Sequence, residues 1–375
     1  MSQLQTGISA AAADRIALRW YAVPAVVVGL VALAWFVASG APTIGITGEL
    51  SIARIAIYGT LVAGILVFGY AYRYGQINRG AWQKLNGPTR ALDITTLTIS
   101  HAVVVVALVA LLCFVLTNAF KGLMFDPYTA ALLVSAMVGM ASYALIILAL
   151  NINIGQIVAM LAVVLIGGVL LAMVTNQQAN WWQINFSYLG SADSANSLAF
   201  NLTLVFSGLM MVALSRFVFD QPKQLYGKSA QHIKILEGLF IATALALAGV
   251  GLFPYTPDTI LVYLHNWSAT LLVVFILAMI VGLRWYVPSI SREFTYTSYM
   301  IALVLTIMVW LFQGIGYLSL TAFELSAFGV SFVWLVLLMR NLQLLPKPDP
   351  ARQEQVVPAK VQAKSPARRP SVVSI

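Results

Sequence analysis

The sequence has few charged residues, and this shortage excludes a water-soluble protein. Asp, Glu, Lys and Arg make up 9% of the 375 residues, whereas a soluble domain carries roughly 25%. Too few charges remain to cover a surface that faces water. Hydrophobic residues account for 61% of the chain. We therefore expect most of the chain to lie in a lipid bilayer.

Cysteine is nearly absent, because Cys113 is the single one in the chain. An intrachain disulfide is thereby excluded, and no Cys/His spacing typical of a metal site occurs. We interpret Cys113 as a small buried apolar side chain. The sequence predicts neither a metal ion nor a cofactor.

Segments that alternate between apolar and polar residues are also missing. Inside hydrocarbon every backbone N–H and C=O needs an internal partner, which leaves helices or closed barrels. Barrel strands would appear as alternating segments of about 10 residues. The apolar residues form longer blocks instead, and several exceed the roughly 18 residues that indicate a membrane helix. These blocks predict an all-α fold, a polytopic bundle of transmembrane helices.

Ten blocks are long enough to cross the membrane, and the first follows a polar segment that ends at Arg19. We expect this first block to be retained as a span, because no small-residue cleavage site follows it directly. The ten spans are predicted near 20–39, 53–72, 99–120, 129–149, 152–175, 197–218, 235–253, 259–283, 297–318 and 322–340.

The positions of the basic residues predict the orientation of the spans. Lys and Arg favour the cytoplasmic side of a membrane. With a cytoplasmic N-terminus, all of the 21 Lys and Arg residues except Arg54 and Lys121 fall on the cytoplasmic side. An even number of spans then places the C-terminus there as well. The net charge of +9 follows from this asymmetry and does not indicate a nucleic-acid partner.

The segment from 341 to 375 is basic, rich in Pro, Ala and Ser, and without an amphipathic period. This composition predicts a disordered cytoplasmic tail. Basic residues next to a membrane attract anionic lipid headgroups. The tail either fixes the topology as a solvated segment or serves as a contact for membrane lipids or a membrane-protein partner.

Unusual polar residues gather at the predicted outer face, where the longest external loop runs from 176 to 197. Ionisable residues within spans are costly and rare, so they are candidates for a functional site. No residue is assigned a catalytic role. We predict an outer-face polar site formed by Ser187, Asp193, Asn201, His265, Asn266 and Glu324.

His265 is expected about two turns inside the eighth span, and Glu324 near the outer start of the tenth. A pairing of His265 with Glu324 or with Asp193 would offset part of the cost of burying these groups. A structural interpretation stands beside this one. In it Asp193 caps the helix that follows, and the other polar side chains fix the packing of the helices.

The same residues give the second half of the chain a resemblance to DUF998, a family of bacterial and archaeal six-span membrane proteins. The shared features are a Leu-Gly loop, a Phe-Asn in the next span, a Gly-Phe-Pro turn, a membrane His and a late Glu. In this chain they are Leu189-Gly190, Phe200-Asn201, Gly251 to Pro254, His265 and Glu324. Many family members carry Arg after the late Glu, where this chain has Leu325.

The resemblance covers spans five to ten and implies three parts of the chain. These are an N-terminal four-span region (1–150), a six-span DUF998-like region (151–340) and the cytoplasmic tail (341–375). It also implies a bacterial plasma membrane. The family is related in pattern to the eukaryotic Frag1/DRAM/Sfk1 proteins, which suggests lipid remodelling or membrane trafficking by analogy of fold.

Three functions are compatible with the sequence. The first is a lipid-handling or envelope-associated protein whose outer-face site binds a headgroup, with His265 as a general acid or base if the protein is an enzyme. The second is a non-catalytic scaffold or subunit that uses its basic tail as a contact. The third is a secondary transporter, whose site would lie near the middle of the bilayer.

Overall fold

The computed structural model describes residues 9–80, 86–191, 194, 197–256 and 259–346. Within these ranges ten helical segments are long and apolar enough to cross a membrane. The predicted all-α polytopic bundle is thereby confirmed. The tail beyond residue 346 and Asp193 lie outside the described residues, so the predictions for them stay predictions.

The helices follow the predicted order of spans. The first span consists of α1 and α2, which meet at Tyr21. The last helix before the tenth span, α10, ends in a π-helical turn over Trp310–Gly314. The bounds are α1 Ala10–Trp20, α2 Ala22–Ala38, α3 Ile52–Asn78, α4 Gly87–Ala119, α5 Pro127–Leu150, α6 Ile154–Thr175, α7 Ser197–Tyr226, α8 Gln231–Leu252, α9 Ile260–Tyr286, α10 Arg292–Val309 and α11 Leu320–Gln343.

Short polar side chains fix where several helices begin. The first backbone N–H groups of a helix have no partner within the helix, so a capping oxygen stabilises its start. These caps stand at the starts of helices that are long and apolar enough to span a membrane. They are Ser51 for α3, Asn86 for α4, Asp126 for α5, Asn153 for α6, Thr259 for α9, Ser291 for α10 and Ser319 for α11.

Three of the helical segments extend well beyond the predicted spans. The first starts at Ala10 instead of near 20. The helix α4 starts at Gly87 instead of near 99, and α7 ends at Tyr226 instead of near 218. The apolar blocks mark only the part of a helix inside hydrocarbon. The extension of α4 carries Asp93, which pairs with Arg216 of α7, and the extension of α7 carries Lys223, which pairs with Glu237 of α8. These polar contacts continue the two helices past the apolar blocks.

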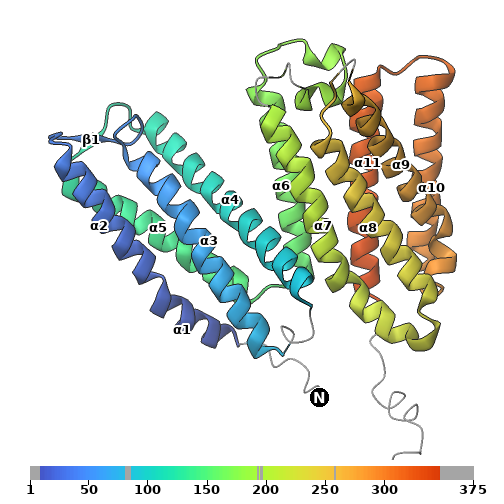
Figure 1. Ribbon diagram of the computed structural model, residues 1–375, viewed down its shortest axis with the longest axis horizontal. Coiled ribbons are helices and arrows are strands. Elements are labelled where there is room, and N and C mark those ends of the chain that lie inside the picture. Colours follow the sequence, from blue (N-terminus) through green and yellow to red (C-terminus); the bar gives the residue numbers. More distant parts are fainter. Residues whose placement is uncertain (1–8, 81–85, 192–193, 195–196, 257–258, 347–375) are drawn as a thin grey trace, which may run out of the picture.

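The helices form two bundles that lie side by side (Figure 1). One bundle contains α1 to α5 and the other contains α6 to α11. The helix α4 packs against α6 and α7 and so connects the two bundles. In this view the bundles are close at their lower ends and apart at their upper ends. The upper end of the first bundle is tied by a two-stranded antiparallel pair, β1 (Ile44–Gly45) and β2 (Met124–Phe125).

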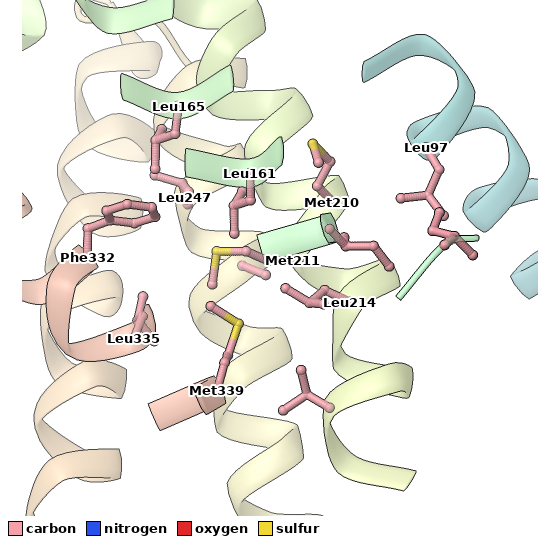
Figure 2. Packing of buried hydrophobic residues seen from close by; sticks show 14 of the residues in the cluster. Leu97, Leu161, Leu165, Met210, Met211, Leu214, Leu247, Phe332, Leu335 and Met339 are labelled. Atoms are coloured by element: carbon pink, nitrogen blue, oxygen red, sulfur yellow. The ribbon is translucent and has the colours of Figure 1, made fainter. Parts of the chain in front are cut away.

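The second bundle packs around a sulfur-rich core (Figure 2). Methionine side chains are flexible and fill irregular gaps between helices. The helices α7 and α8 approach closely at Gly208, where an added methyl group would lie 2.4 Å from the Ala244 carbonyl oxygen. The core includes Leu161 and Leu165 of α6, Met210, Met211 and Leu214 of α7, Leu247 of α8, and Phe332, Leu335 and Met339 of α11.

Candidate functional site

The loop between α6 and α7 folds back into the second bundle at its predicted outer end. A short 3-10 helix over Phe186–Gly190 packs with all five of its residues buried. The ring of Phe186 contacts Phe200 edge to face, with the ring centres 5.4 Å apart. The loop is therefore an integral part of the bundle and covers the polar residues beneath it.

Two glycines allow this loop to reach α7. The Asn201 side-chain amide donates a hydrogen bond to the Gly190 carbonyl oxygen at 2.9 Å. A methyl group at position 190 would lie 2.3 Å from Asn201 Oδ1 and 2.8 Å from the Phe200 ring. At position 251 it would lie 2.5 Å from the Asn201 carbonyl oxygen. The Leu-Gly, Phe-Asn and Gly-Phe-Pro features thus meet at one contact.

His265 lies beneath the loop with 4% of its surface exposed. Its Nδ1 lies 2.8 Å from the Phe253 carbonyl oxygen, which can only accept a hydrogen bond. Nδ1 therefore carries a proton in this arrangement. In the neutral ring Nε2 is then the acceptor, and the Ser187 hydroxyl donates to it at 3.0 Å. The imidazole connects the loop to the Gly-Phe-Pro turn.

Glu324 holds the same loop from the other side. Its Oε2 accepts a hydrogen bond from the Phe186 backbone N–H at 2.7 Å. Glu324 and His265 do not form the predicted pair. Instead each binds one of two adjacent loop residues. The reason is local: the loop offers Glu324 a backbone N–H, that of Phe186, and offers His265 a side-chain hydroxyl, that of Ser187.

The structure therefore brings together four of the six predicted residues. Ser187, His265 and Glu324 meet at the start of the 3-10 helix, and Asn201 anchors its end. Asn266 follows His265 on α9 and is exposed, so it points away from this group. We call Ser187, Asn201, His265 and Glu324 the outer polar cluster.

The hydrogen bonds of the outer polar cluster determine which chemistry it could support. A hydroxyl that donates to an imidazole, whose other nitrogen is oriented by a third group, is the arrangement of an activated nucleophile and its base. Here the third group is a backbone carbonyl, that of Phe253, instead of a carboxylate. Ser187 and His265 are both buried in this conformation. Among the described residues no group of His, Cys, Asp and Glu has the geometry of a metal site.

A second polar cluster lies between the two bundles, and the sequence interpretation missed it. Asp93 of α4 is 1% exposed and forms an ion pair with Arg216 of α7. The fully buried Tyr72 of α3 lies within electrostatic range of both charges. The charge distribution counts Arg216 only among the basic residues of the predicted cytoplasmic side, and the structure shows in addition that its guanidinium pairs with the Asp93 carboxylate.

Further polar contacts lie along the same boundary between the two bundles, which we call the seam. His101 of α4 donates from Nδ1 to the Leu97 carbonyl oxygen at 2.7 Å, and its Nε2 accepts from the Gln156 amide of α6 at 3.2 Å. Arg79 donates to the carbonyl oxygens of Leu150 and Ile152, where α5 turns into α6. We call Tyr72, Asp93, His101, Gln156 and Arg216 the seam cluster.

A helical period in the sequence could have revealed the seam cluster. Asp93, Thr96 or Leu97, and Ser100 or His101 recur at intervals of three to four residues, which places them on one face of a helix. The long apolar run after 101 hides this pattern when spans are located by hydropathy alone.

These features define a class of protein. In the described part of the chain ten helical segments are long and apolar enough to cross a membrane, which makes the chain a multi-pass integral membrane protein. Residues 157–341, from α6 to α11, match the family described as "Protein of unknown function (DUF998)". This match confirms the predicted resemblance of the second half of the chain to the DUF998 family. Searches of curated proteins and of solved structures found no match.

Proposed function

We propose that this protein handles membrane lipids and that the outer polar cluster recognises the polar headgroup of its lipid. The observation that supports this proposal most directly is the hydrogen bond between Ser187 Oγ and His265 Nε2, 3.0 Å long, inside the outer end of a helical bundle. A hydroxyl and an imidazole can both exchange hydrogen bonds with phosphate or sugar groups. The acyl chains of the same lipid would stay in the surrounding hydrocarbon.

The loop over 186–190 controls access to these groups in this proposal. Ser187 and His265 are buried, so a headgroup reaches them only when the loop moves. Glu324 holds the loop through the Phe186 N–H. A headgroup that carries hydrogen-bond donors would compete with that N–H for the Glu324 carboxylate. Release of the loop would then uncover the Ser187 hydroxyl and the imidazole together.

The site of action in this proposal is the outer leaflet of a bacterial plasma membrane. The support is the distribution of basic residues, which predicts that the loop from 176 to 197 faces outward. The lipid would enter sideways from the bilayer, as its chains never need to leave hydrocarbon.

Lipid analysis of a deletion strain tests the proposal. Loss of the gene should change the lipid profile measured by mass spectrometry, and the wild-type chain should restore it. His265→Ala and Glu324→Gln should fail to restore it. Asn266→Ala is the matched control, because this exposed neighbour lies outside the outer polar cluster and should restore the profile fully.

Membrane abundance of each variant must be measured beside the lipids, so that loss of folding is separated from loss of function. A deletion strain whose lipids equal those of the wild type would refute the proposal. Full complementation by both His265→Ala and Glu324→Gln would show that the outer polar cluster has no part in the proposed lipid function.

A further inference from the structure

A cavity of about 440 Å³ lies in the first bundle, far from the outer polar cluster along the chain. It is formed where α1 bends into α2 and leaves a space against α3 and α5. Its volume falls in the range of roughly 300–1,000 Å³ that is typical of sites for small molecules. Its lining comprises Ile16, Arg19 and Trp20 of α1, Val23 and Pro24 of α2, Leu66, Val67, Tyr70, Ala71 and Tyr74 of α3, and Ile146 and Leu150 of α5.

One wall of the cavity is a row of aromatic rings. The Trp20 and Tyr70 ring centres are 6.1 Å apart, and those of Tyr70 and Tyr74 are 6.4 Å apart with the rings stacked. Trp20 and Tyr70 are 52% and 61% exposed, so the row borders the surrounding lipid. Indole and phenol groups favour the depth of the lipid headgroups, where one end is wet and the other apolar.

Among the described residues that line the cavity, Arg19 alone has a charged side chain. In the part of the chain that the structure describes, no protein acceptor takes a hydrogen bond from it. The nearby carboxylate of Asp14 on α1 already accepts from the Tyr143 hydroxyl. Arg15 on α1 adds a further positive charge at the same end. The mouth of the cavity is therefore cationic and has an unused guanidinium.

The floor of the cavity is apolar. Ile146 and Leu150 are buried beneath it, and Val23 and Leu66 are exposed along its sides. A soluble anion would contact Arg19 but leave this surface empty. A molecule with one anionic end and a hydrocarbon chain matches both parts. Basic residues at the membrane surface attract anionic lipids by roughly 1 kcal/mol each.

We infer that this cavity is a binding site for an anionic glycerophospholipid of the cytoplasmic leaflet. The phosphate lies against Arg19 and the hydroxyls of Tyr70 and Tyr74, and one acyl chain lies along Val23 and Leu66. The predicted cytoplasmic N-terminus assigns the leaflet. This site is separate from the outer polar cluster and does not depend on its proposed function.

Native mass spectrometry of the full-length protein in mild detergent tests the inference, with phosphatidylglycerol and phosphatidylcholine as probes. The wild type should bind one phosphatidylglycerol at least fivefold more tightly than phosphatidylcholine. Arg19→Gln should reduce phosphatidylglycerol binding about fivefold, the equivalent of one basic residue. Val23→Trp, which fills the cavity from its exposed side, should weaken the binding of both lipids.

Arg284→Gln is the matched control, because it removes one exposed arginine from the cytoplasmic end of α9 in the other bundle. Its phosphatidylglycerol binding should equal that of the wild type. The inference would be overturned if Arg19→Gln and Arg284→Gln lost phosphatidylglycerol binding equally. It would also be overturned if neither Arg19→Gln nor Val23→Trp weakened that binding. His265→Ala should leave this binding unchanged, so failure here and failure of the headgroup proposal are distinguishable.

Discussion

Asp93 and Arg216 form an ion pair that joins the N-terminal bundle to the DUF998 bundle. The two residues are 123 positions apart in the sequence and lie on α4 and α7. Asp93 is almost fully buried, and the Arg216 side chain is 27% exposed. Two charges at this depth are stable only as a pair, so this contact fixes how the bundles dock.

Removal of one member of this pair should destabilise the protein. Asp93→Leu leaves the Arg216 guanidinium without its counter-charge and should cost about 3 kcal/mol, the lower end of the range for buried pairs because Arg216 is partly exposed. The double variant Asp93→Leu/Arg216→Met should lose less than Asp93→Leu alone. Denaturant unfolding in detergent micelles measures both. Additive losses in the double variant would show that the pair does not act as a unit.

Glu324→Ala should loosen the loop over the outer polar cluster. The variant leaves the Phe186 N–H without its acceptor, which costs about 1–3 kcal/mol for a buried donor. Hydrogen exchange at residues 186–187 should become at least about fivefold faster. Glu293→Ala, at the opposite end of the bundle in the first turn of α10, is the control and should leave this exchange unchanged. Slow exchange at Phe186 in Glu324→Ala would contradict the assigned role.

Gly190→Ala should disrupt the contact between the loop and α7. The added methyl group would meet Asn201 Oδ1 at 2.3 Å and the Phe200 ring at 2.8 Å. Overpacking of this kind typically costs about 1–3 kcal/mol. Gly167→Ala is the comparison, because nothing lies within 4 Å of a methyl group there and α6 gains a better helix former. The melting temperature should fall for Gly190→Ala and stay equal or rise for Gly167→Ala.

Cysteine labelling tests the predicted orientation of the chain. Cys113→Ala provides a cysteine-free background, to which Gln183→Cys or Asn78→Cys is added; both positions are exposed. A membrane-impermeant maleimide should label Gln183→Cys in intact cells and Asn78→Cys only after lysis. The reverse labelling pattern would show that the orientation is opposite to the predicted one, with the outer polar cluster on the cytoplasmic side.

The sequence predicts the spans well because the partition of a segment of about 20 residues into hydrocarbon depends mainly on the apolarity of its side chains. It predicts the start of α4 and the end of α7 poorly, because those turns carry polar residues whose partners lie on other helices, Asp93 with Arg216 of α7 and Lys223 with Glu237 of α8. Hydropathy shows which part of a helix is apolar enough for hydrocarbon. It carries no information about an ion pair between residues that are far apart in the sequence.

For the outer polar cluster too, the sequence reveals some of the side chains but not their hydrogen-bond partners. Asn201, His265 and Glu324 are recognisable because polar side chains are rare in apolar segments. Their partners are not recognisable, since His265 binds the Phe253 carbonyl and Glu324 binds the Phe186 N–H. Backbone groups carry no signature in the sequence, so the direct pairing of the two side chains was the simpler expectation.

The length of α4 links this protein to the thickness of its membrane. Its 33 residues span about 50 Å, whereas the hydrocarbon core measures about 30 Å. A helix with this excess adapts by tilting or by protruding into the aqueous phase. A thicker bilayer would therefore let α4 stand more upright, and a thinner one would increase its tilt or its protrusion.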